Sequence, residues 1–348
     1  MATTLSSLQK IPTSFASCSL HPSPSHPLPT ILQAIASASF TGIELSFPNL
    51  LSHASSIANK SVSESDFSTL CTAATDIKKR CADLNLEIML LQPFANFEGW
   101  PRGSKEREEA FTRAKGWIEI MLAAGCKTLQ VGSTDSAPEK ISTKKADIVQ
   151  DLRELADLLA QHGLRMAYEN WCWSTHAPGW RQVWDIVKAV DRENVGLCLD
   201  TFQSAGGEWG DPTTALGMVE GEGVEEKWAE SLRDLAATVP QEKIYLLQIS
   251  DAYRMEKPIE DKEVDGLRPR GRWSHDYRPL VGEGRGYLPC AEFARAVAKT
   301  GFVGWWSYEV FDWPDWEAES YNEGRDVGEY AKRARRAHEK FLGEVAEE

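Results

Sequence analysis

The sequence predicts a single (β/α)8 TIM barrel with a long loop between strand 7 and helix 7. Two observations predict this fold. Eight short apolar runs alternate with segments of helical periodicity, and a chain of 348 residues has the length that eight strand–helix units need. An open doubly wound sheet is the rival for such alternation, but no Gly-x-Gly-x-x-Gly sequence follows the first strand, which weakens that alternative.

The expected strands are short apolar runs bounded by polar or turn-forming residues. In chain order they are Ile11–Cys18, Gly42–Phe47, Leu86–Gln92, Thr128–Gly132, Leu164–Glu169, Val195–Asp200, Ile244–Ile249 and Gly304–Val310. Apolar residues at helical spacing mark the segments between them. The expected helices are Asp66–Leu84, Lys105–Ala124, Asp147–His162, Trp180–Val190, Ala215–Ala237, Leu288–Lys299 and Trp316–Leu342.

No internal repeat or linker divides the chain, so we expect residues 1–348 to form one domain, with residues 1–9 as a flexible N-terminal tail. Glu256–Arg285 is a long polar insert after the seventh strand. Loops of that length in compact domains are often functional lids. The insert is therefore a candidate part of the functional site.

Composition excludes several classes of partner. With 38 Lys and Arg against 52 Asp and Glu, the net charge is −14, whereas nucleic-acid and anionic-membrane surfaces call for basic residues. Seven cysteines without a CxxC pair favour a reducing compartment. The N-terminal stretch is a poor signal peptide, and no segment approaches a membrane span. We expect a cytoplasmic protein with no nucleic acid and no membrane partner.

Four oxygen-bearing side chains lie at the ends of four consecutive expected strands: Glu169, Asp200, Gln248 and Glu309. In a TIM barrel these strand ends face one mouth, where the active site lies, and alternation along each strand lets all four side chains converge. Three carboxylates in one place repel one another unless a cation lies between them, and an all-oxygen set favours Mg²⁺ or Mn²⁺ over Zn²⁺. The alternative is that each group caps a separate turn or forms a surface ion pair.

The polar insert carries an unusual group of basic residues for so acidic a chain: Arg268, Arg270, Arg272, Arg278 and Arg285. Guanidinium groups suit carboxylates and phosphates, so at least one of them is a candidate for binding an anionic substrate. The alternative is a solvated loop that balances nearby acids. Of the thirteen tryptophans, most are expected in the core, but Trp173 and Trp273 are candidates for an aromatic wall at the mouth.

These residues resemble the xylose isomerase-like TIM-barrel superfamily, which uses a Glu–Asp–His/Gln–Glu metal set on late strands. Within it, the chain is similar to the fungal 3-dehydroshikimate dehydratases of quinate catabolism. The resemblance spans most of the chain from the second strand onward, whereas the first strand matches poorly. It rests on the stretches LQPFANFEGW, YENWCWST, GLCLDTFQSAGG, YLLQISDA, RGRWSHDYR, GRGYLP and GWWSYEVF.

The resemblance implies dehydration of 3-dehydroshikimate, a small-molecule carboxylate, to protocatechuate with a divalent metal ion such as Mn²⁺, Mg²⁺ or Co²⁺. It implies Glu169, Asp200, Gln248 and Glu309 as metal ligands, Glu169 or Glu309 as the base, and His275 as the acid. Candidate substrate-binding residues are Gln92, Trp173, Arg270, Trp273 and Arg278. Two departures bear on the substrate: His275 stands where an arginine is expected, and Gln203 where relatives have His or Asn.

Other functions of the same barrel stay open at this point. A sugar or sugar-phosphate isomerase or epimerase would use the same metal set, but its substrate often lacks a carboxylate. The endonuclease relatives need histidine-rich zinc sites and a basic face, and this chain has seven histidines and a net negative charge. A barrel that binds a small molecule without catalysis would be expected to lack one or more metal-ligating side chains, whereas all four positions in this chain carry oxygen donors. The sequence leaves the general base and homo-oligomer formation open.

Overall fold

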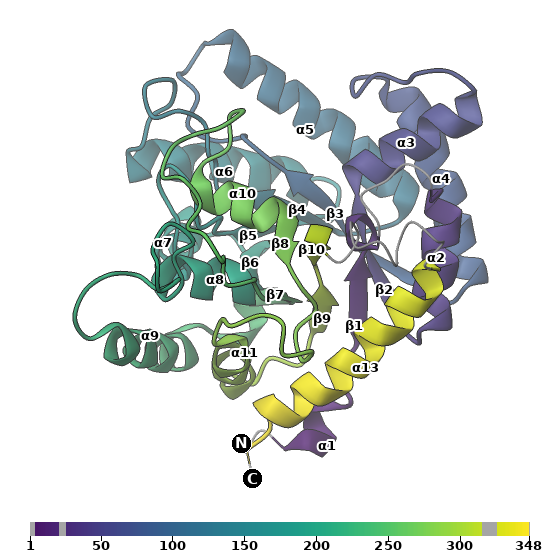
Figure 1. Ribbon diagram of the computed structural model, residues 1–348. Coiled ribbons are helices and arrows are strands. Elements are labelled where there is room, and N and C mark those ends of the chain that lie inside the picture. The colour runs from purple at the N-terminus through teal and green to yellow at the C-terminus, as the bar shows by residue number, and fades with distance from the viewer. Residues whose placement is uncertain (1–3, 21–25, 315–325, 348) are drawn as a thin grey trace.

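A computed structural model describes residues 4–20, 26–314 and 326–347. Within these residues eight parallel strands close into a barrel (Figure 1). The strands are β1 (Thr13–Ala16), β2 (Gly42–Ser46), β3 (Glu87–Phe94), β4 (Thr128–Gly132), β5 (Arg165–Glu169), β6 (Val195–Asp200), β7 (Ile244–Ile249) and β9 (Trp305–Tyr308). Strand β1 pairs with both β2 and β9, which closes the ring. The predicted TIM barrel is confirmed.

The strands are buried on both faces because helices cover the outside and side chains fill the inside. Every residue of β1, β2, β4 and β6 is buried. The interior is narrow, and small or apolar side chains lie one step below the polar groups at the strand ends. These interior residues are Met89, Leu90, Ala167, Cys198 and Leu246.

The helices follow the strands around the barrel. They are α1 (Leu5–Leu8), α2 (Leu28–Ser37), α3 (Phe47–Ala58), α4 (Phe67–Asp83), α5 (Lys105–Ala124), α6 (Lys145–Ala160), α7 (Trp180–Val190), α8 (Thr201–Glu208), α9 (Val224–Thr238), α10 (Pro269–Asp276), α11 (Cys290–Lys299) and α13 (Val327–Val345). Helix α5 begins after Ser104, whose side chain accepts from the Arg107 amide, and ends at Gly125 with φ +76°. Ser, Asp and Thr at the start of a helix and glycine just after its end are the preferred caps.

Most expected boundaries shift by one or two residues, and three expectations change more. Helix α9 begins at Val224 rather than Ala215, because Gly217, Gly221 and Gly223 all have positive φ. Residues 5–8 of the expected flexible tail form α1, and the side chain of Leu8 is buried; Figure 1 shows α1 beside the C-terminal end of α13. Residues 316–325 of the expected last helix lie outside the described residues, and the described part begins at Val327, after the cap Asp326.

The insert Glu256–Arg285 contains the short helix α10 and the two-residue strand β8 (Tyr277–Arg278). Strand β8 pairs antiparallel with β10 (Phe311–Asp312), with Arg278 opposite Phe311. Because β10 follows β9 almost directly, this pairing fixes the insert over the C-terminal end of the barrel, where α10, β8 and β10 lie together (Figure 1). Among the described helices, not one has the length and apolar content that a membrane crossing requires.

Candidate active site

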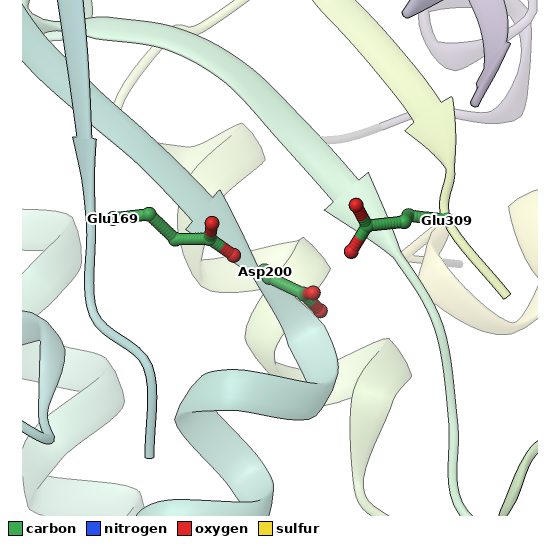
Figure 2. A group of neighbouring side chains, drawn as sticks. All are labelled: Glu169, Asp200 and Glu309. Carbon is green, nitrogen blue, oxygen red and sulfur yellow. The ribbon is translucent and has the colours of Figure 1, made fainter. Parts of the chain in front are cut away.

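Three carboxylates meet at the C-terminal end of the barrel. Glu169 ends β5, Asp200 ends β6, and Glu309 directly follows β9. Their side chains point toward one another from three strands (Figure 2). One carboxylate oxygen from each lies within 4.8 Å of the others, and all three side chains are nearly inaccessible to solvent. The structure thus brings together the three acids that the strand-end pattern singled out.

Gln248, the fourth predicted ligand, lies beside Asp200 in the sheet but its amide is used elsewhere. Its Nε2 donates to Glu44 Oε2 at 2.8 Å, and its Oε1 accepts from the Cys198 thiol at 3.1 Å. Glu44 comes from β2 and is completely buried. Burial, and then the charge of Glu309, raise the pKa of Glu44 to about 8. A polar layer that includes a fourth acid, Glu44, therefore lies directly beside the three carboxylates.

Arg278 is the positive charge among these acids. Its guanidinium donates to Asp200 Oδ2 at 2.6 Å and to Glu309 Oε2 at 3.1 Å. It also lies over the rings of Phe202 and Phe311, 4.8 and 5.2 Å from their centroids. The side chain is 1% exposed, and it reaches this position because β8 pairs with β10 next to Glu309. Such charge-assisted bonds in a buried site are stronger than neutral ones.

The electrostatics show that this cluster is short of positive charge. Burial raises the pKa of Glu169 well above its usual range, and the charges of Glu309 and Asp200 raise it further. Burial also raises the pKa values of Asp200 and Glu309, although Arg278 opposes both shifts. Buried carboxylates with raised pKa values are stabilised by any additional cation placed among them.

The donor set fits a divalent cation. Glu169 Oε2 accepts from the Trp171 indole at 3.1 Å and from the Gln130 amide, whereas Glu169 Oε1 is buried and has no hydrogen-bond partner among the described residues. A buried, unpaired carboxylate oxygen is costly, and a cation beside it removes that cost. All the donors are oxygen atoms, which are the ligands of hard divalent ions.

A cavity of about 280 Å³ is lined by Glu169 and Glu309, two of the three acids. Trp171 and Trp173 stack on each other at its wall, with centroids 5.2 Å apart and planes at 20°. Gln92 also lines it and donates to Glu309 Oε1 at 2.9 Å. Of the predicted site residues, the structure places Glu169, Glu309, His275, Gln92, Trp173 and Arg278 on this cavity. Partial burial lowers the pKa of His275.

Arg270 and Trp273, also predicted to bind substrate, are not among the residues that line this cavity. Arg270 donates to the carbonyl oxygens of Gly206 and Gly210 at the end of α8 and forms an ion pair with Asp211 at 2.9 Å. Trp273 is fully buried, with its indole bonded to a backbone carbonyl. Both residues hold α10 on the barrel. The physical reason is that a helix lying across the mouth turns these side chains toward the protein.

Of the other insert arginines, Arg268 bonds the backbone of the loop that follows β5, and Arg272 bonds two carbonyl oxygens within the insert. Arg285 forms ion pairs with Asp312 and Glu283. Arg278 is thus the one among the five that lines the cavity.

Sequence reasoning missed several polar groups near the site. Gln130 and Glu44 lie within the apolar runs TLQVG and GIELS, and a polar residue inside a buried strand was the available signal. Glu98 was also missed, although it connects three loops at the mouth. Its Oε1 accepts from the Thr134 amide at 2.8 Å, from the Tyr168 hydroxyl at 2.9 Å and from His176 Nε2 at 3.0 Å.

In a closed eight-stranded barrel the active site lies at the C-terminal strand ends, and the buried acidic triad found there could hold a metal ion. The model of the xylose isomerase-like TIM barrel family matches residues 32–328. The chain therefore belongs to the xylose isomerase-like TIM barrel family, as the resemblance in its motifs predicted.

The chain is similar to two curated proteins named 3-dehydroshikimate dehydratase. The protein from Neurospora crassa is 34% identical over 297 residues, which cover 82% of each chain. The protein from Pseudomonas aeruginosa is 32% identical over 285 residues, which cover 82% of this chain and 36% of that one, so this chain spans about a third of the bacterial protein. A solved xylose isomerase-like TIM barrel/4-hydroxyphenylpyruvate dioxygenase fusion protein is 25% identical with a TM-score of 0.68, covering 94% of this chain and 42% of that chain.

Proposed function

We propose that this protein is a divalent-metal-dependent hydro-lyase that converts 3-dehydroshikimate into protocatechuate and water. The similarity to the Neurospora crassa protein over 82% of both chains supports this reaction. One structural observation carries it further: three buried acids and a single arginine meet at a cavity walled by Trp171 and Trp173. A cyclic keto acid needs these three elements, for its ketone, its carboxylate and its ring.

Glu169, Asp200 and Glu309 would hold the metal ion, and Gln248 is the candidate neutral ligand. Mn²⁺, Mg²⁺ or Co²⁺ suits these oxygen donors. When bound, such an ion supplies Lewis-acid polarisation of a substrate carbonyl oxygen. The chain's own residues then have three tasks: to orient the ring, to remove a proton and to protonate the hydroxyl that leaves.

Arg278 is the candidate partner of the substrate carboxylate, because its guanidinium fork lies at the cavity wall and matches a carboxylate in shape. Trp173 and its stacked neighbour Trp171 supply a flat apolar wall that excludes water from the ring. Gln92 borders the same space and holds Glu309 in place through its amide. These contacts would fix the ring relative to the acids, which lowers the entropic part of the barrier.

The proton to be removed is on the carbon next to the ketone, and the hydroxyl one carbon further leaves as water. Glu169 or Glu309 is the candidate base, because both carboxylates border the cavity in which the substrate would lie. His275 borders the cavity and is the candidate acid for the hydroxyl. Its lowered pKa makes this role strongest at acidic pH, where the imidazolium is more abundant.

We also propose that residues 1–348 act as one domain in the cytoplasm on a small-molecule carboxylate, with no nucleic acid or membrane partner. The net charge of −14 and seven cysteines, none in a disulfide, support this setting. Whether copies of the chain form a homo-oligomer is a separate question that sedimentation of the purified protein answers.

The test is turnover by protein of verified metal content. Incubation with 3-dehydroshikimate should produce the absorbance of an aromatic product, stop with EDTA and return with Mn²⁺, Mg²⁺ or Co²⁺. Common aldoses and ketoses serve as the matched substrates for the alternative, a sugar or sugar-phosphate isomerase or epimerase of the same family. If metal-loaded protein interconverts a ketose pair and forms no aromatic product, the dehydratase proposal is wrong.

A further inference from the structure

The chain places a cation of its own among the candidate metal ligands. The Arg278 guanidinium bonds both Asp200 and Glu309, and it also donates to the hydroxyls of Ser250 and Ser274. Two phenyl rings lie next to the guanidinium, and its surroundings are nearly closed to solvent. Arg278 therefore occupies a preformed, buried ion-pair site. A divalent ion that bound Asp200 and Glu309 would meet two carboxylates that are already paired with the guanidinium.

Hydrogen bonds already engage five of the six carboxylate oxygens in the cluster. Asp200 Oδ1 accepts from the Phe202 amide and the Ser250 hydroxyl, and Glu309 Oε1 accepts from Gln92. The partners of Glu169 Oε2 are described above, and Asp200 Oδ2 and Glu309 Oε2 accept from Arg278. Glu169 Oε1 is the oxygen without a partner among the described residues. A metal ion that binds Asp200 Oδ2 or Glu309 Oε2 therefore competes with Arg278 for that oxygen.

Arg278 also faces the cavity, together with Ser274 from the preceding turn. A carboxylate bound in this cavity can accept hydrogen bonds from the guanidinium, which in the metal-free protein donates to Asp200 and Glu309. Because a like charge close to a cation site weakens binding of the cation, withdrawal of the guanidinium strengthens it. By thermodynamic linkage, the metal ion would strengthen carboxylate binding by the same factor.

We propose that Arg278 competes with the divalent ion for Asp200 and Glu309, and that a carboxylate ligand in the cavity relieves this competition, so that metal ion and carboxylate bind cooperatively. The inference rests on the proposed function, because it takes the substrate to be a carboxylate that pairs with Arg278. In the metal-free protein, Arg278 forms ion pairs with Asp200 and Glu309. The metal ion and the carboxylate ligand together separate Arg278 from these two acids.

The wild-type protein provides the first test. Mn²⁺ affinity is measured by isothermal titration calorimetry with and without saturating shikimate, which has a hydroxyl in place of the ketone and cannot undergo the reaction. We expect Mn²⁺ to bind about tenfold tighter with shikimate present, within the usual range of coupling between two sites. The methyl ester of shikimate is the matched control and should leave Mn²⁺ affinity within about twofold, because it has no charged carboxylate. Equal Mn²⁺ affinity with and without shikimate would overturn the proposal.

Variants separate charge from shape. Arg278→Met removes the competing cation, so Mn²⁺ alone should bind about tenfold tighter or more than in the wild type, and shikimate should no longer change the affinity. Arg278→Lys keeps a positive charge and should stay closer to the wild type. Arg270→Met makes the same charge change in the preceding helix α10, where the partners of Arg270 are α8 and Asp211, and should leave Mn²⁺ affinity unchanged. Weaker or unchanged Mn²⁺ binding in Arg278→Met contradicts competition.

If metal-free Arg278→Met does not fold, the Mn²⁺ affinity of the wild-type protein with and without shikimate is sufficient to test the proposed competition. Both assays measure binding without turnover, so they are independent of the proposed reaction. If shikimate and Mn²⁺ are coupled but 3-dehydroshikimate is not converted, the dehydratase proposal falls and the competition stands. If 3-dehydroshikimate is converted but shikimate does not change Mn²⁺ affinity, the competition proposal falls and the dehydratase proposal stands.

Discussion

Gln248 and Glu44 are joined by a hydrogen bond of 2.8 Å across the barrel interior, from β7 to β2. Neither residue is accessible to solvent. The Gln248 amide donates to Glu44 Oε2, and hydrogen bonding from Gln248 and Ser307 opposes the rise in the pKa of the Glu44 carboxyl. The residue predicted as a neutral metal ligand thus also supports a buried acid.

Gln248→Leu should therefore lower stability as well as activity. It leaves the Glu44 carboxyl without the amide donor, and an unsatisfied buried polar group costs about 1–3 kcal/mol. Urea unfolding of metal-free protein measures the free energy of unfolding. The double variant Glu44→Leu/Gln248→Leu removes both partners, so its cost should be less than the sum of the single costs. Additive costs would show that the two side chains do not support each other.

Glu169→Gln, Asp200→Asn and Glu309→Gln should each lose bound Mn²⁺ and activity together. Each change removes one anionic oxygen ligand from the cluster, which weakens a site built from hard donors. Metal content after dialysis and turnover are measured on the same samples. Asp251→Asn is the control, because Asp251 also follows a strand end but accepts from the backbone amides of Ala252, Tyr287 and Leu288. Full metal occupancy in all three triad variants would show that the acids are separate turn caps.

Arg278→Ala should reduce kcat/KM far more than Arg285→Ala. Truncating one partner of a buried charge pair costs about 2–5 kcal/mol, which corresponds to a loss of thirtyfold to several thousandfold. Arg285 lies outside the cavity and pairs with Asp312 and Glu283, so its removal should mainly affect how the insert is held. Steady-state kinetics with 3-dehydroshikimate gives both values. Equal and small losses would mean that neither arginine contacts the substrate.

Glu98→Ala should loosen the mouth of the barrel. Its Oε1 accepts three hydrogen bonds from residues on β5 and in the loops that follow β4 and β5, and their loss leaves buried donors unpaired. We expect a loss of stability of about 3 kcal/mol or more, together with a raised KM. Glu106→Ala, on the exposed face of α5, is the control and should stay within about 0.5 kcal/mol of the wild type. A change at Glu98 as small as that at Glu106 would contradict the predicted role.

His338 should make stability fall in mild acid. Burial lowers the pKa of this histidine from 6.5 to about 3, so the unfolded chain binds a proton between these values that the folded protein does not. Its contribution to stability is full above pH 6.5 and is lost as the pH falls toward 3, by about 2 kcal/mol between pH 7 and pH 5. His338→Phe has no such proton, so its unfolding free energy should fall less over this range. Parallel pH profiles for the two proteins would show that His338 is not responsible.

Much of the fold and of the acidic triad follows from local sequence. The eight strands coincide with the apolar runs of the sequence, several of which end in a polar residue. Alternation along each strand sets which side chains face inward. Once eight such strands close, their C-terminal ends share one mouth, so Glu169, Asp200 and Glu309 had to converge. Of the described helices, local periodicity missed α1, α2, α3, α8 and α10. Helices α3 and α8 begin directly after β2 and β6, where the change of period is hard to see.

Tertiary structure alone decided which arginine reaches the acids and what Gln248 bonds. Arg278 enters the site because β8 pairs with β10, more than thirty residues further along the chain, while Arg270 is turned toward α8 by the helix that carries it. Gln248 meets Glu44 because the barrel brings β7 opposite β2. The sequence by itself determined the strands, their inward faces and the chemical types at their ends. Contacts between distant segments depend on how the ring closes and how the insert lies over it, and no local periodicity records that geometry.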